Sequence, residues 1–305
     1  MNTQETILQL EELKLKGMAE FYKSMQSLPV NEWPSIDLFA ARMAEAERQY
    51  RSAKKTEMYL KTSKLRYNSM LEDVYCSNER NLTKDTLMQL MDCSFIGRAE
   101  NILIDGKTGC GKSFLACALG RQACFMGYRV EYFSMNKFIE RIALAKLDGT
   151  MMKVVNHIQR NDLVIFDDFG LQPLDNNSRL ALLQILEDCY MRKSVIVTSQ
   201  LPVAKWYDYI NEPTIADAIM DRLTAGDTHR IELKGDSLRR KKQNNTNFAE
   251  PHCNHFEVVH YIALQAVHYK PLQEVHLSRY NQRTIQQDVE THRQYDRRSA
   301  ESCLF

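Results

Sequence analysis

Hydrophobic residues near the start of the chain recur every three or four positions, which is the spacing of one face of a helix. The residues that follow this spacing are Ile7, Leu8, Leu10, Leu13, Leu15, Met18, Phe21 and Met25. Pro29 and Pro34 interrupt the pattern, and a second helical stretch follows from about Asp37. Proline disrupts a helix interior, so we predict separate helices on either side of this break. Together they predict a small N-terminal helical domain over residues 1–75.

From about Asn81 to Lys242 the pattern changes, and short apolar runs rich in β-branched residues alternate with helical stretches. Strands are predicted at residues 101–105, 129–133, 163–166, 194–198 and 229–233. Alternating strands and helices are typical of a parallel sheet with right-handed crossovers. We therefore predict an α/β fold of the three-layer P-loop NTPase type, with its ATPase domain over residues 76–242.

The remaining residues, 243–305, show no clear period and are rich in Gln and Asn near their start. We predict a poorly ordered tail outside the catalytic core. Six of the eight histidines lie here, and His252, Cys253 and His255, with His260 beyond, could hold a metal ion. A second ligand pair at zinc-finger spacing does not follow in the sequence, which argues against a structural zinc site.

One eight-residue segment matches the phosphate-binding pattern G-x-x-x-x-G-K-[ST] at every fixed position. It consists of Gly106, Lys107, Thr108, Gly109, Cys110, Gly111, Lys112 and Ser113. The segment follows a predicted strand and opens a predicted helix over residues 113–126, which argues against a glycine-rich turn without a ligand. Glycines let backbone amides turn inward to cradle phosphates. We expect Lys112 to reach the β- and γ-phosphates and Ser113 to help hold Mg²⁺, so the predicted cofactors are ATP and Mg²⁺.

A second motif places two acids directly after the buried run 163–166. Ligands bind at the carboxyl ends of the strands in an open α/β sheet. We expect Asp167 to hold Mg²⁺, through a water molecule, and Asp168 to polarise the attacking water. Glu usually holds the second position, and the shorter Asp predicts slow hydrolysis. The alternative is that Asp168 only caps a turn before Gly170.

A basic stretch interleaved with tyrosines lies in the later part of the second N-terminal helix. It contains Arg48, Arg51, Lys54, Lys55, Lys61, Lys64 and Arg66, with Glu57 as the single acid among them, and Tyr50, Tyr59 and Tyr67. A basic face of this kind can contact a phosphate backbone. Lys54, Lys55, Lys61 and Lys64 are the candidate DNA-binding residues, and a solvated helix face is the equal alternative.

Composition narrows the class of protein. The chain has 305 residues, of which 44% are hydrophobic and 26% charged, and a net charge of +1, so no global field would draw it to nucleic acid. An apolar leader and a run long enough to span a membrane are not seen in the sequence. The eight cysteines form no C-x-x-C pair, as expected of reduced thiols in a cytoplasmic protein.

These motifs in this order resemble the IstB family of transposition helper ATPases, which are relatives of the DnaC helicase loaders within the AAA+ class. The resemblance extends from about Gln9 to Lys242. The segments that carry it are Leu13–Glu20, Asp167–Gly170, Thr198–Trp206, Ala216–Leu223 and Leu233–Arg239. It does not extend into the tail, so nothing is carried over to residues 243–305.

The resemblance implies three further site residues. Gln200 follows the strand at 194–198 and would orient water beside the γ-phosphate, unless it points into solvent. Arg222 would be an arginine finger inserted into the site of a neighbouring subunit, and its alternative is a solvated arginine at a helix end. Arg239 would touch the γ-phosphate of its own subunit, unless residues 239–242 form one undifferentiated basic cluster.

The function implied is that of an ATPase serving a transposase. Head-to-tail subunits would form a homo-oligomeric ring or spiral on double-stranded DNA, largely without sequence preference. ATP binding would drive assembly, and hydrolysis would control target capture and release.

Two other functions stay open at this stage. One is a DnaC-like replicative helicase loader. Trp206 and the run from Ser199 to Pro202 favour a transposition helper over this alternative. The other is a P-loop kinase for a small molecule, which would need a lid carrying arginines near the phosphates. The basic N-terminal segment does not suggest such a lid.

Overall fold

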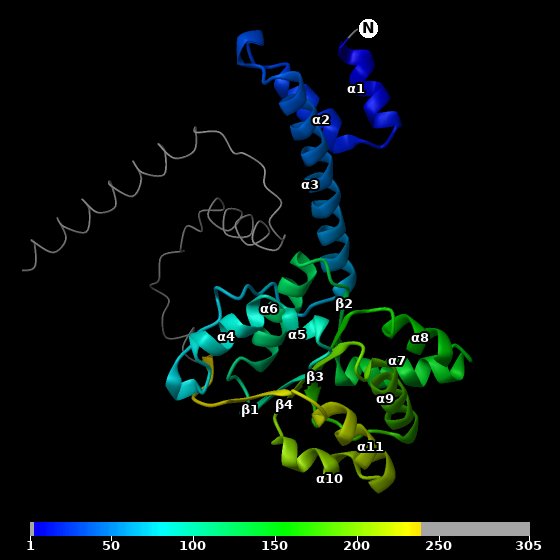
Figure 1. Cartoon of the computed structure of the whole chain (residues 1–305). Helices are drawn as coiled ribbons and strands as arrows, with labels where there is room; N and C mark the ends of the chain where they lie inside the picture. Colours follow the sequence, from blue (N-terminus) through cyan, green and yellow to red (C-terminus); the bar gives the residue numbers. More distant parts are fainter. Residues whose placement is uncertain (1–2, 239–305) are drawn as a thin grey trace, which may run out of the picture. The chain divides into compact units, whose positions relative to one another are not determined.

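The computed structural model of the chain describes residues 3–238 (Figure 1). The predicted tail over residues 243–305 and the predicted nucleotide contact Arg239 lie outside the described residues, as do the histidines of the candidate metal cluster. Among residues 3–238, no helix is long and apolar enough to cross a membrane.

A five-stranded, wholly parallel sheet forms the centre of the ATPase domain (Figure 1). Its strands are β1 (Ile102–Gly106), β2 (Val130–Ser134), β3 (Leu163–Phe169), β4 (Ser194–Ser199) and β5 (His229–Leu233). The spatial order is β2-β3-β4-β1-β5. All five predicted strands are present, and each begins within one residue of the predicted start. The order places β4 between the phosphate-binding loop after β1 and the acids that end β3.

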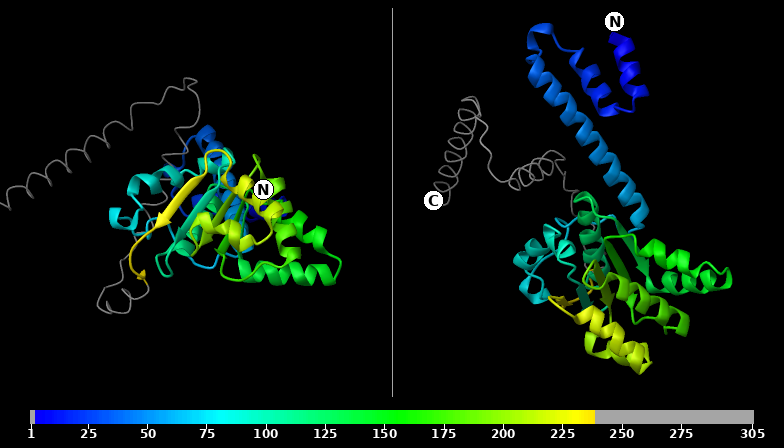
Figure 2. Two further views of the ribbon diagram at one scale, coloured as in Figure 1. Left: turned by 90° about the horizontal axis from the view of Figure 1, so that it is seen from below. Right: turned by 45° about the vertical axis from the view of Figure 1, so that its right-hand side comes forward.

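Helices cover both faces of this sheet, which confirms the three-layer architecture (Figure 2). They are α4 (Lys84–Met91), α5 (Ser94–Gly97), α6 (Lys112–Phe125), α7 (Met135–Leu147), α8 (Met151–Ile158), α9 (Asn176–Cys189), α10 (Trp206–Ile210) and α11 (Pro213–Thr224). Successive strand residues face opposite sides, so Ile102 and Ile104 join the α4–α6 core while Leu103 joins the α7–α11 core. Both faces are apolar, as a doubly covered parallel sheet requires.

The predicted N-terminal helices are also present. They are α1 (Thr3–Glu12), α2 (Lys16–Met25) and α3 (Ile36–Ser63), with a short 3₁₀ turn, η1 (Val30–Glu32), at the break that the prolines predicted. At Gly17, α2 approaches α3 so closely that a Cβ would lie 2.6 Å from the carbonyl oxygen of Ala46. Glu47 on α3 is buried and accepts a hydrogen bond from the backbone N–H of Met18 at 3.2 Å. This carboxylate satisfies an N–H in the first turn of α2, which would otherwise lack a partner within its helix.

The last turn of α3 belongs to the core of the ATPase domain. Tyr59 is buried among core residues and accepts a hydrogen bond from Arg129 at 3.4 Å. Leu65 packs beside Gly120 of α6, where an added Cβ would lie 3.0 Å from its Cδ2. Lys64 ends the helix in the left-handed conformation, with φ of 55°. The helix that carries the basic stretch is therefore anchored directly on the nucleotide-binding domain.

Candidate active site

The phosphate-binding loop lies between β1 and α6, as predicted. Gly109 and Gly111 have φ of 85° and 93°, which is the left-handed region that favours glycine. A Cβ at Gly109 would lie 2.2 Å from the hydroxyl oxygen of Ser237, so a larger residue would clash there as well. Gly111 caps the 14-residue helix α6, whose N-terminus faces the loop. The positive end of the helix dipole and the unpaired N–H groups therefore favour an anion at this position.

Lys112 is buried and holds its ammonium group inside the loop. Its Nζ donates hydrogen bonds to the carbonyl oxygens of Gly106 at 2.8 Å and Lys107 at 3.0 Å. A lysine fixed by its own loop is positioned to meet phosphate oxygens with little rearrangement. The predicted role of Lys112 in phosphate binding fits this geometry.

Asp167 is fully buried at the end of β3 and is surrounded by hydroxyl groups. Its Oδ1 accepts a hydrogen bond from Ser113 at 2.8 Å and another from Thr198. Its Oδ2 accepts one from the Tyr132 hydroxyl at 2.5 Å. Burial, followed by the charge of Asp167, raises the pKa of Tyr132, so its hydroxyl stays protonated as a donor. The two sequence motifs thus meet through the Ser113–Asp167 hydrogen bond.

The oxygen atoms of this pair fit a hard divalent cation. Mg²⁺ prefers carboxylate, hydroxyl and water oxygens, and Ser113 and Asp167 supply the first two types side by side. Tyr132 and Thr198 were not predicted as site residues. Both lie near the carboxyl ends of strands adjacent to β3, and this placement was the available signal.

Asp168 occupies a distorted part of β3. The register of the strand shifts between Phe166 and Phe169, and Asp168 has φ of 62°. Asp and Asn are the non-glycine residues that tolerate this left-handed conformation best, which gives a physical reason for Asp in place of the longer Glu. Its carboxylate lies 3.2 Å from the guanidinium of Arg66. Burial, followed by Asp167, raises the pKa of Asp168, and Arg66 opposes that shift.

Gln200 follows β4 and points toward the phosphate-binding loop. Its Oε1 accepts a hydrogen bond from the Thr108 hydroxyl at 2.6 Å. The Gln200 side chain is exposed to solvent as well as bonded to the loop, so its role beside the γ-phosphate stays a prediction. Because β4 lies between β1 and β3, Gln200 stands close to both motifs without being near either in sequence.

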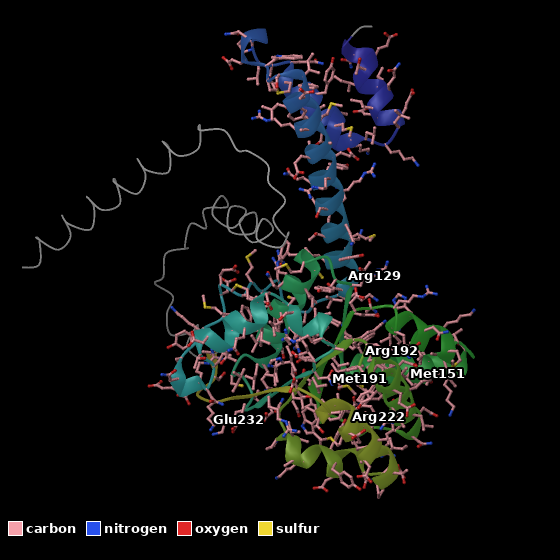
Figure 3. All side chains as sticks on the ribbon, in the orientation of Figure 1. Arg129, Met151, Met191, Arg192, Arg222 and Glu232 are labelled. Atoms are coloured by element: carbon pink, nitrogen blue, oxygen red, sulfur yellow. The ribbon has the colours of Figure 1, made fainter. Side chains whose placement is uncertain are left out.

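Arg222 lies near the end of α11 (Figure 3). It is at the end of the sheet where β1 begins. Its backbone carbonyl accepts a hydrogen bond from Asn101, which precedes β1, whereas the phosphate-binding loop follows β1. The five residues of β1 separate these two positions by about 16 Å. The guanidinium contacts Asp221 at 3.2 Å and Glu187 at 3.5 Å, beside a cavity of about 290 Å³. Arg222 does not join the site of its own chain.

Several positive charges of the basic stretch on α3 are paired with glutamates of the same helix, more than the sequence predicted. Arg48 pairs with Glu45 and Arg51 with Glu47, both at 2.7 Å, and Lys54 pairs with Glu57 at 2.8 Å. The expectation of a single acid overlooked the glutamates one turn earlier on the same helix. Arg66 turns toward Asp167 and Asp168 instead of joining this surface. Lys55, Lys61 and Lys64 are exposed.

Arg80 is a site residue that the sequence did not reveal. Its side chain is buried, donates hydrogen bonds to the carbonyl oxygens of Cys110 and Tyr75, and lies 5.5 Å from the centre of the Tyr75 ring. Segments 75–80 and 235–238 enclose a cavity of about 160 Å³ there. The backbone N–H of Leu238 donates to the Gly109 carbonyl at 3.0 Å, so this cavity borders the phosphate-binding loop.

The chain is similar to bacterial proteins named insertion sequence ATP-binding proteins. It is 39% identical over 238 residues to a putative insertion sequence ATP-binding protein of Sinorhizobium fredii, covering 78% of this chain and 97% of that protein. It is 36% identical over 203 residues to the putative ATP-binding protein of insertion sequence IS1162 of Pseudomonas fluorescens, covering 66% and 88%.

Solved structures of similar arrangement include the DnaC helicase loader and the replication initiator DnaA bound to AMPPCP and single-stranded DNA. The first is 17% identical with a TM-score of 0.45, covering 55% of this chain and 98% of that one. The second is 22% identical with a TM-score of 0.48, covering 65% and 60%.

The family comparison agrees with the site geometry and with the order of motifs along the chain. Residues 8–246 match the family described as IstB-like ATP binding protein, which includes the ATPase domain and the N-terminal helices. The chain therefore belongs to the IstB-like ATP-binding family, and its phosphate-binding loop is that of a P-loop ATPase.

Proposed function

We propose that this protein binds and hydrolyses Mg²⁺-ATP to control its assembly on double-stranded DNA, and so helps a transposase to capture and release its target. The observation that carries the proposal is the convergence of three chain segments at one sheet edge. Ser113 contacts Asp167, and Thr108 contacts Gln200, so the loop after β1 is bonded to the ends of β3 and β4.

The residues at this edge divide the chemistry among them. Lys112 and the loop amides bind the phosphates, and Ser113 and Asp167 hold Mg²⁺, which when bound neutralises charge on the phosphate oxygens. Asp168 accepts a hydrogen bond from the attacking water, and Gln200 orients that water through its amide.

We assign to Arg222 the role of an arginine finger that acts in the ATP site of a neighbouring copy of the chain. It lies at the end of the sheet away from its own loop, so it acts on nucleotide only if a neighbouring copy presents that nucleotide to it. This arrangement makes the proposed oligomer head-to-tail, because the phosphate-binding loop and Arg222 lie at opposite ends of β1.

The proposed partners follow from the family and from the exposed lysines. Relatives are named insertion sequence ATP-binding proteins, so the proposed client is the transposase of the same element. Exposed Lys55, Lys61 and Lys64 support backbone contacts with DNA that do not depend on sequence. The proposed place of action is the cytoplasm, where ATP and DNA meet.

The test is binding of a fluorescent duplex, measured with no nucleotide, with ADP and with a non-hydrolysable ATP analogue, together with negative-stain imaging of the same samples. We expect tight binding and rings or spirals only with the ATP analogue. Equal binding under all three conditions would defeat ATP-controlled assembly. Co-purification with a replicative helicase in place of a transposase would favour the helicase-loader alternative. ATP hydrolysis that is stimulated by a small alcohol but indifferent to DNA would favour a kinase.

A further inference from the structure

A cation from the N-terminal side of the chain lies at the acidic pair of the ATP site. The Nη1 atom of Arg66 is 3.2 Å from Oδ2 of Asp168 and 3.7 Å from Oδ2 of Asp167. More than a hundred residues of sequence separate the guanidinium from either acid, so the contact exists only in the folded protein. The family resemblance and the site motifs assign no role to this arginine.

The backbone around Arg66 is fixed to the phosphate-binding helix. The Tyr67 ring lies 5.3 Å from the Arg66 guanidinium and packs against Phe114, the residue after Ser113, with ring centres 6.4 Å apart. The Ser69 hydroxyl donates to the Phe114 carbonyl at 3.1 Å. The Arg66 side chain itself is 44% exposed. It can therefore leave the acids without disturbing the core.

Arg66 is also joined closely to the N-terminal helices. Lys64, two residues earlier, ends α3, and α3 carries α2 on its other half (Figure 1). The end of α3 and the residues after Arg66 are both packed on α6, so the part of Arg66 that is free to move is its side chain.

We propose that Arg66 is a positioning residue that holds the Asp167–Asp168 pair and competes with Mg²⁺ for it. Two cations close to one carboxylate repel each other, so Mg²⁺ held at Asp167 disfavours a guanidinium 3.7 Å away. Arg66 also occupies a carboxylate oxygen of Asp168 that would otherwise accept a hydrogen bond from water. Rotation of the exposed Arg66 side chain into solvent would favour the Mg²⁺-bound arrangement.

This inference rests on the proposed Mg²⁺ role, and the test separates the two. Binding of a fluorescent ATP analogue is titrated with Mg²⁺ for the wild type and for Arg66→Gln, without DNA. We expect the half-saturating Mg²⁺ concentration of Arg66→Gln to be about three- to tenfold lower, because a competing cation has been removed. Arg66→Lys keeps the positive charge, so competition between charges predicts a Mg²⁺ requirement within about twofold of the wild type.

Arg160→Gln is the matched control, since it removes an exposed guanidinium just beyond α8. Its half-saturating Mg²⁺ concentration should equal that of the wild type. Thermal unfolding of each variant checks that it is folded. A wild type that needs no Mg²⁺ would defeat the proposed metal role. A Mg²⁺-dependent wild type with an unchanged or higher requirement in folded Arg66→Gln would defeat the role of Arg66 alone. An equal decrease in Arg66→Lys and Arg66→Gln would show that charge competition is not the cause.

Discussion

The carboxyl edge of the sheet and the basic surface of α3 both concentrate polar side chains, but they use them differently. At the sheet edge, Asp167 and Lys112 are buried and hydrogen-bonded to groups of the same chain. On α3, Lys55 and Lys61 are exposed, and the neighbouring ion pairs Arg48–Glu45 and Lys54–Glu57 lie within the helix. Buried polar groups need hydrogen-bond partners within the fold, so the structure of one chain is enough to show how the site residues are arranged. The role of exposed charges depends on a binding partner, which the structure of one chain does not include.

The largest expected effect tests the carboxyl edge of the sheet. Lys112→Ala removes the ammonium group fixed inside the loop, and we expect ATP binding to be abolished, with affinity lower by at least about 10⁴-fold, or about 5.5 kcal/mol. Titration with a fluorescent ATP analogue measures the loss. Lys107→Ala is the control, because that lysine contributes its backbone carbonyl to the loop and should bind ATP nearly normally. Tight binding by Lys112→Ala would refute the assignment of this loop.

The next prediction tests whether the ATP site at the carboxyl ends of the strands needs a residue from a second copy of the chain. If Arg222 acts in trans, Arg222→Ala should bind ATP normally and hydrolyse it about 10³-fold more slowly. Mixing it with Lys112→Ala should restore activity, because each variant supplies the half-site that the other lacks. A flat response across mixing ratios, with mixed assembly confirmed by light scattering, would remove the trans role. The carboxyl edge would then be complete within one chain.

Asp168→Asn should have a smaller effect on hydrolysis, a decrease of about 10²-fold or more, with ATP binding retained. The amide keeps the shape and tolerates the left-handed backbone, but it has no negative charge with which to polarise water. Single-turnover hydrolysis measures the rate, and DNA complexes should live longer. Hydrolysis at the wild-type rate would make Asp168 structural.

The sequence predicted those site residues that lie close to a strand end or to one another in the chain, and it did not predict contacts between distant residues. The phosphate-binding loop and the acids after β3 each lie within a few residues of a strand end, so spacing alone predicted both them and their proximity. Arg66 was counted with the basic stretch of the second N-terminal helix, because its position in the chain gave no sign of the fold that brings it to Asp168. Arg80 was missed for the same reason, since its partner Cys110 lies 30 residues away.

The smallest expected effect tests the open surface of α3. Replacing Lys55 and Lys61 by Gln and Lys64 by Asn, which suits the left-handed position, removes three exposed charges. If all three contact phosphates, the slope of log affinity against log salt should fall by roughly two to three. Lys54→Gln alone should change the slope less, because Lys54 is already paired with Glu57. An unchanged slope in the triple variant would leave this surface a solvated helix face.

The close contact at Gly17 has a mechanical consequence. Because no side chain fits between α2 and the backbone of α3 there, and Glu47 bonds to the first turn of α2, the two helices resist sliding past each other. The 28 residues of α3 make a rod of about 42 Å, with its far end seated in the ATPase core by Tyr59. A force that a partner applies to α2 would therefore be transmitted along α3 to Tyr59, in the core of the ATPase domain.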